Sequence, residues 1–209
     1  VSAYAPAEDL AGQVDYFVER LTEAVESEEE YEDSKEQVAK DANTLILIAL
    51  GLGLHDQEND YKASAGTLMK AAQEAAAATD YAAAKTAVDA VEAATEGDDP
   101  SDVALQWENV ASLPELMNQV PTVNTKLKRY MRGSRFKTEA DETTGYSATI
   151  AVIGQGSRPN VGQTEKPDLA EQWEQFCLQM RDAAGAVNGA IHAQDREAVI
   201  ALAWVVVQV

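Results

Sequence analysis

Apolar residues recur three and four positions apart along most of this chain, which is the spacing of one face of an α-helix. The alanine-rich stretch 60–96 shows the pattern most clearly and predicts two helical arms, 60–78 and 80–96, folded back as an antiparallel hairpin. Asp60 and Asp80 are expected to cap these arms, because a short carboxylate accepts the free N–H groups of a first turn. No stretch alternates strictly between apolar and polar positions, as a half-buried strand does.

The same spacing predicts further helices on both sides of the hairpin. They are expected at 7–26, 28–53, 112–130, 136–154, 167–191 and 196–209, with a long loop at 154–166. Ser27 is expected to cap the second of these helices and Asp195 the last. The run 45–50 is apolar all round, which predicts burial on several sides. Pro121 is expected to kink its helix or to split it. The core of the last part is expected on one face of the helix from 167, at Trp173, Phe176, Met180, Val187 and Ile191.

A break at 97–101 combines glycine, proline and acids without any periodicity. It divides the chain into two halves, 1–97 and 103–209, in which a similar order of helices and capping aspartates recurs. The prediction is therefore an all-α fold made of two antiparallel four-helix bundles in tandem.

Charge narrows the range of partners. The 209 residues carry a net charge of −20, which repels nucleic acid phosphates and anionic lipid heads. No apolar run reaches the roughly 18 residues that span a bilayer. A cationic protein partner fits such a surface, although a solvated acidic surface is the favoured interpretation. Lys126, Lys128, Arg129, Arg132, Arg135 and Lys137 form a basic cluster. It would either recognise an anionic group or, as favoured here, stay solvated or pair with the acidic helix that starts at Glu28.

Candidate chemistry is sparse. Cys177 is the single cysteine, and it is expected to be a small buried thiol. His55 is followed by Asp56, Glu58 and Asp60, a set that could ligate a metal, but a solvated loop is the favoured interpretation. The chain has no glycine-rich phosphate loop, no nucleophile motif and no paired Glu-x-x-His motif. The sequence therefore assigns no catalytic or metal-binding residue and favours a protein that is not an enzyme.

The end of the chain is similar to a known family. A helix with the run 180–187, a short turn at 193–195 and an alanine- and valine-rich last helix resemble the end of a cytochrome c prime-type bundle. The resemblance implies a periplasmic or otherwise extracytoplasmic protein of electron transfer or small-ligand binding. In that family Cys-x-x-Cys-His holds the haem. This chain lacks the motif, and Cys177 lies on a different helix, so haem c is expected only if the native chain continues beyond Val209. The alternative is a non-catalytic interaction module with an acidic surface.

The two ends of the chain bear on export and assembly. Val1 stands where Met would begin a chain, and Ala3-Tyr4-Ala5 weakly resembles the end of a signal peptide, which would indicate export. Pro6 directly after Ala5 argues against cleavage at that point. At the other end Val199, Leu202, Val206 and Val209 form a helical seam, while Trp204, Val205 and Val207 lie off it. This apolar surface needs a second cover. Burial against the first half is the favoured cover, ahead of a homodimer and of a haem.

Overall fold

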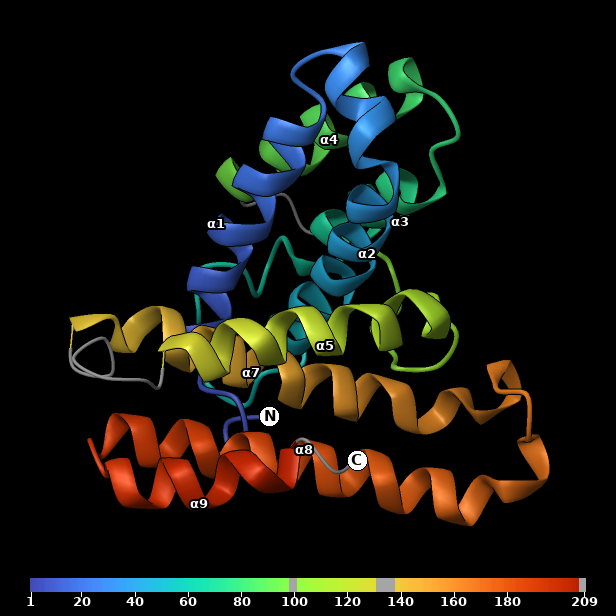
Figure 1. The fold of residues 1–209 in the computed structure, drawn as a ribbon. Helices are drawn as coiled ribbons and strands as arrows, with labels where there is room; N and C mark the ends of the chain where they lie inside the picture. Colours follow the sequence, from blue (N-terminus) through green and yellow to red (C-terminus); the bar gives the residue numbers. More distant parts are fainter. Residues whose placement is uncertain (98–100, 131–137, 207–209) are drawn as a thin grey trace.

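The computed structural model describes residues 1–97, 101–130 and 138–206 (Figure 1). Over this part of the chain it is built from α-helices and two short 3-10 helices, and it has no strand. The prediction of an all-α fold is confirmed. The predicted boundary at 97–101 falls partly outside the described residues, as do Phe136 and the basic residues Arg132, Arg135 and Lys137.

The first four helices gather in the upper part of Figure 1. They are α1 (Ala7–Ala24), α2 (Glu28–Gly53), α3 (Ala65–Ala77) and α4 (Tyr81–Glu96). Helix α2 packs against α1 and α3, and α4 packs against α3 and α1. Ser27 caps α2 by accepting the Glu30 N–H at 3.2 Å, and Asp80 caps α4 by accepting the Ala83 N–H at 2.9 Å. Both predicted caps are confirmed.

The predicted cap at Asp60 is wrong, because residues 60–64 form turns and α3 begins at Ala65. Asn59 explains the late start. Its side-chain amide donates to the Leu52 carbonyl at 3.0 Å, and its carbonyl accepts the Tyr61 N–H at 3.2 Å. Such side-chain bonds give the backbone an alternative to a helical turn.

The remaining helices lie across the lower part of Figure 1. They are α5 (Leu113–Tyr130), α7 (Ala140–Ser157), α8 (Ala170–His192) and α9 (Arg196–Val206), with 3-10 helices η1 (Arg158–Gln163) and η2 (Pro167–Leu169) between α7 and α8. The long loop predicted at 154–166 is wrong, since α7 continues to Ser157 and η1 follows directly. Pro121 lies inside α5 and does not split it. Asp195 caps α9 by accepting the Ala198 N–H at 3.0 Å, as predicted.

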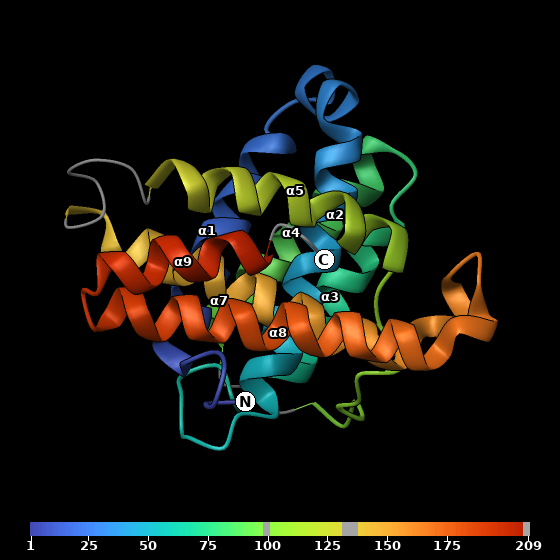
Figure 2. The ribbon, with the colours of Figure 1, turned by 60° about the horizontal axis from the view of Figure 1, so that its bottom comes forward.

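Helix α7 lies at the centre of the molecule. It packs against α1, α2, α5 and α8 (Figure 2). Every residue from 143 to 154 is buried. Close packing is achieved with small residues: a Cβ on Gly154 would lie 2.9 Å from the Arg181 backbone nitrogen of α8. The apolar run 45–50 of α2 is buried as predicted, and one hydrophobic cluster includes residues of all eight labelled α-helices of the described chain. The division into halves 1–97 and 103–209 stays a prediction.

The predicted core face of α8 is partly wrong. Met180, Val187 and Ile191 are buried as expected, but Trp173 is only half-buried and Phe176 is 41% exposed. Cys177 is buried, as predicted for the lone thiol. The buried face of α8 therefore begins at Cys177, and the first two turns of the helix contribute no buried side chain.

The last helix packs as expected over its described residues. Val199 is fully buried and Leu202 packs partly buried against the core. The side chains of Trp204, Val205 and Val206, together with residues 207–209, lie outside the described residues, so the prediction of a second cover stays untested there. Among the described helices, none has the length and apolar character needed to cross a membrane.

Candidate functional site

A cleft of about 620 Å³ opens where α1, α7 and the end of α8 meet. Its wall carries four carboxylates, two tyrosines, a glutamine and a histidine. The lining residues are Glu8, Asp9, Gly12, Gln13, Tyr16, Asp141, Glu142, Tyr146 and His192. A concave site with one sign of charge concentrates cations, and this cleft combines that property with ligand-type side chains.

Asp9 is the buried centre of the charged groups. Its Oδ2 accepts a hydrogen bond from Asn188 Nδ2 at 2.7 Å and lies 2.9 Å from His192 Nε2. Asn188 is itself buried, and its amide also donates to the Thr144 carbonyl at 3.1 Å. Asn188 therefore fixes the orientation of the Asp9 carboxylate by tying it to α7 and α8 at once.

Glu8 completes a group of three ligand-type side chains. One donor atom from each of Glu8, Asp9 and His192 can be chosen so that all three lie within 4.8 Å of one another. Glu8 and His192 are exposed to the cleft, whereas Asp9 is only 8% exposed. Glu8 and Asp9 lie in the first turn of α1, and His192 is the last residue of α8.

The polar floor of the cleft is fixed by α7. Gln13 is buried, and its Oε1 accepts a hydrogen bond from Thr149 Oγ1 at 2.9 Å. Its side chain crosses α7 at Gly145, where an added Cβ would lie 2.4 Å from the Gln13 Nε2. The glycine thus allows α1 to approach α7 closely enough to form the cleft.

Two tyrosines that line the cleft also contact Lys126, which is not itself a lining residue. The Tyr16 and Tyr146 rings meet edge to face with centroids 5.7 Å apart. Lys126 Nζ lies 4.6 Å and 5.7 Å from these two centroids and donates to the Tyr16 hydroxyl. Desolvation by burial lowers the pKa of Lys126. The described part of the basic cluster thus contacts aromatic rings through Lys126 rather than the acidic start of α2.

Sequence reasoning missed this site. It assigned no metal or catalytic residue, and the structure brings Asp9 and His192 together across 183 positions of the chain. The local signals were two adjacent acids in a first helical turn and a histidine in a last turn, which are also ordinary responses to the helix dipole. His55, singled out as part of a solvated loop, is instead 2% exposed, while Asp56 and Glu58 are exposed. That part of the loop prediction is wrong, because the His55 ring is enclosed by the segment before α1.

Comparisons with known protein families, with curated proteins and with solved structures find no match to this chain.

Proposed function

We propose that the chain is a small-ligand-binding helical protein whose ligand is a divalent transition-metal cation, held in the cleft by Glu8, Asp9 and His192. The observation that supports this proposal most directly is the convergence of one imidazole and two carboxylates within 4.8 Å. Imidazole and carboxylate together suit Zn²⁺ and related first-row ions. Asp141 and Glu142 add negative charge to the same cleft, which favours cation entry.

The spacing of the donors is close to that of a metal site. At metal–ligand distances of about 2.0–2.2 Å, two ligands of a tetrahedral ion lie about 3.3 Å apart. The 2.9 Å between His192 Nε2 and Asp9 Oδ2 needs to widen only slightly. Glu8 is exposed and has to swing inward, and ordering one such side chain costs about 0.5–1.5 kcal/mol. Asn188 would hold Asp9 from behind, in the way that outer-shell partners orient metal ligands.

Zinc titration of the metal-free chain by calorimetry tests the proposal. We expect one bound ion per chain, and expect His192→Gln and Asp9→Asn to weaken binding by at least 10-fold, since each removes a ligand. Glu23→Gln is the matched control for Asp9→Asn, because it also removes one carboxylate charge, here from an exposed position of α1 outside the cleft. If the control bound zinc as weakly as the ligand variants, the weakening would be an effect of net charge, and the proposed site would be ruled out.

A second candidate ligand is a small amine. The specific observation in its favour is that two aromatic rings, Tyr16 and Tyr146, line the acidic cleft, and that both already attract the ammonium group of Lys126 beside it. Ammonium groups bind aromatic faces, and the acids of the cleft would pair with a second charge. A diamine that competes with zinc in the same titration would support this ligand.

Two finer expectations also remain proposals. We propose that each group of four helices is an antiparallel bundle, which the short connections at residues 25–27 and 78–80 favour. A haem c function, with its periplasmic location, depends on residues beyond Val209 that carry the missing motif. A visible spectrum of the protein from its native source tests the haem proposal, because covalent haem absorbs intensely near 400 nm, a range in which an ordinary polypeptide is transparent.

A further inference from the structure

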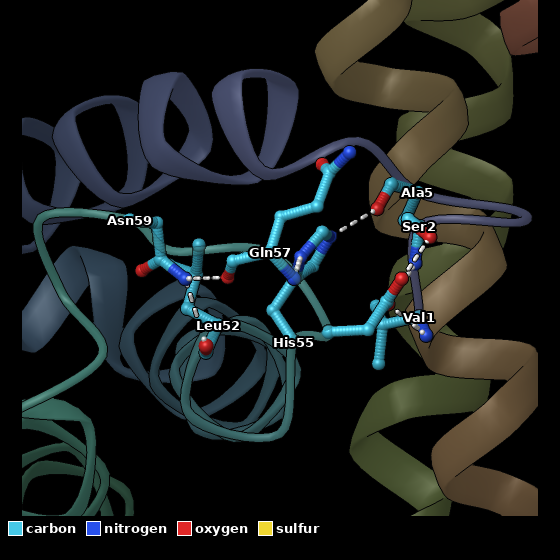
Figure 3. Close-up of polar contacts among 8 residues, drawn as sticks. Val1, Ser2, Ala5, Leu52, His55, Gln57 and Asn59 are labelled. Carbon is cyan, nitrogen blue, oxygen red and sulfur yellow. Dashed lines mark hydrogen bonds and ion pairs between the residues drawn. The ribbon is translucent and has the colours of Figure 1, made fainter.

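Residues 1–6, called here the N-terminal segment, run between three parts of the fold before α1 begins. Ala5 is fully buried. A Cβ added at Gly185 of α8 would lie 2.9 Å from both the Cα and the Cβ of Tyr4, so the segment approaches α8 closely there. The Arg181 guanidinium lies 5.1 Å from the Tyr4 ring centroid. The segment is therefore wedged against α8 on one side. Its other side meets the loop 54–60 (Figure 3).

That loop holds the segment with two adjacent residues. Asp56 accepts the Ser2 N–H at 2.8 Å and also bonds the Ser2 hydroxyl, and these hydrogen bonds lower the pKa of Asp56. His55 Nε2 lies 3.0 Å from the Ala5 carbonyl oxygen (Figure 3). Asn59 stiffens the loop from behind by donating to the Leu52 and Gln57 carbonyls.

The partners of His55 determine its protonation state. Its Nδ1 faces the Gln57 backbone N–H at 3.1 Å, and that group can only donate. Its Nε2 faces a carbonyl, which can only accept. Nδ1 must therefore be the bare nitrogen and Nε2 must carry the proton, so the ring is neutral. A second proton on Nδ1 would set two donors against each other in a site that is 2% exposed.

The His55 contact lies close to the metal-binding residues along the chain. Ala5 is followed by Pro6, whose carbonyl accepts the Leu10 N–H at 3.2 Å in the first turn of α1. Glu8 and Asp9 belong to that turn. Displacing Ala5 therefore displaces the backbone that presents both carboxylates to His192. The surrounding charged or titratable groups are the Val1 amino group and Tyr4 on the segment, Asp56 on the loop and Arg181 on α8.

We propose that His55 is a positioning residue for the cleft: its Nε2–H donates to the Ala5 carbonyl and so fixes Ala5 and the start of α1. The consequence for the metal rests on the proposed function, because without this contact Glu8 and Asp9 no longer converge on His192. The ordering of the N-terminal segment itself does not require a metal.

Two variants separate the roles of the ring. His55→Gln places an amide nitrogen near the position of Nε2, so it keeps the donor to Ala5 and cannot titrate. His55→Asn reaches only as far as Nδ1, so it keeps the Gln57 partner and loses the contact with Ala5. Both remove the imidazole, which makes each the control for the other.

NMR of the metal-free chain is the first test. Long-range ¹H–¹⁵N spectra near neutral pH should show His55 as the Nε2–H tautomer. The amide signals of residues 2–7 should shift in His55→Asn, which loses the contact with Ala5, and should stay close to those of the unmodified chain in His55→Gln. An Nδ1–H tautomer, or equal shifts in both variants, would overturn the inference.

Zinc affinity at one neutral pH is the second test. His55→Gln should bind like the unmodified chain, and His55→Asn should bind about 10-fold more weakly, as for other residues that support metal ligands. Equal affinity of all three would overturn the positioning role. Failure of the unmodified chain to bind zinc would overturn the proposed function instead, and the metal-free NMR still decides the behaviour of His55.

Discussion

Replacing Arg20 with methionine should destabilise the protein in a pH-dependent manner. Arg20 of α1 donates from Nε to Asp41 Oδ2 of α2 at 2.9 Å, and Gln119 of α5 donates to Asp41 Oδ1 at 2.8 Å. Asp41 is 1% exposed, whereas the Arg20 side chain is 23% exposed. Burial raises the pKa of Asp41, and the Arg20 charge counteracts this rise in part. Arg20→Met would leave a buried carboxylate with one neutral partner.

The magnitude follows from the cost of an unpaired buried charge. Removing one partner of a buried ion pair costs about 3–5 kcal/mol, and the partial exposure of Arg20 places this pair near the lower end. We expect a loss of about 3 kcal/mol near pH 7, which moves the urea midpoint by about 1–2 M. Loss of the Arg20 contact with the Tyr16 ring, 5.5 Å from its centroid, contributes about 0.5–1 kcal/mol of this.

The pH dependence tests the cause. A carboxyl whose pKa is raised on folding contributes stability that is present below its unfolded pKa and is lost as the pH rises through its folded pKa. Without Arg20 the folded pKa of Asp41 should rise further. The deficit of Arg20→Met should therefore shrink towards about 1 kcal/mol as the pH falls from about 7 to about 4.5.

Urea unfolding monitored by circular dichroism at both pH values measures this deficit. The control is the double variant Arg20→Met with Asp41→Asn. It has no titrating side chain at position 41, and the amide oxygen of the introduced asparagine can still accept the hydrogen bond from Gln119. It should be more stable than Arg20→Met alone near pH 7. A deficit that is equal at both pH values, or below about 1 kcal/mol near pH 7, would refute the unpaired charge as its cause.

Three further predictions concern packing and caps, each measured by the same unfolding experiment. Phe176→Ala should lower the free energy of unfolding by less than about 1 kcal/mol, because Phe176 is 41% exposed, whereas Met180→Ala should lower it by about 2–5 kcal/mol. The reverse order would refute the observed buried face of α8. Gly154→Ala should destabilise the protein by about 1–3 kcal/mol, because the added methyl group would clash with the α8 backbone. Gly189→Ala, whose methyl group would meet nothing within 4 Å, should stabilise it by about 0.5–1 kcal/mol. Asp80→Ala should cost about 1 kcal/mol through loss of its cap, and no change would contradict the capping bond.

The helices could be predicted from the sequence because their apolar spacing and their caps are local properties. The apolar run of α2 and the caps at Ser27, Asp80 and Asp195 needed no knowledge of the tertiary structure. The start of α3 could not be found in this way, because the Asn59 side chain competes with the helix by bonding to Leu52. Face assignments were less certain. Phe176 is the larger and more apolar residue, but the neighbouring Cys177 meets α7, and only the position of α7 decides between them.

The complete burial of the central helix and the candidate site escaped prediction for a common reason, although the helix itself was predicted at 136–154. Helix α7 is buried over residues 143–154, although its sequence is rich in Thr, Ser and Gly, which an apolar pattern does not mark as core. Small side chains are required along this stretch of α7, because four other helices pack closely against it. At Gly145 the Gln13 side chain of α1 fills the space of a missing Cβ, and at Gly154 the backbone of α8 does so.

These two close approaches also explain why the acids of α1 and the histidine of α8 meet. Helix α1 approaches α7 near Gly145, helix α8 approaches α7 at Gly154, and Asn188 bonds both the Thr144 carbonyl of α7 and the Asp9 carboxylate of α1. The cleft therefore depends on α7 although its proposed ligands lie on other helices. Gly145→Ala, which places a methyl group against Gln13, should weaken zinc binding without removing any ligand. Unchanged zinc affinity in a folded Gly145→Ala variant would show that the ligands converge independently of α7.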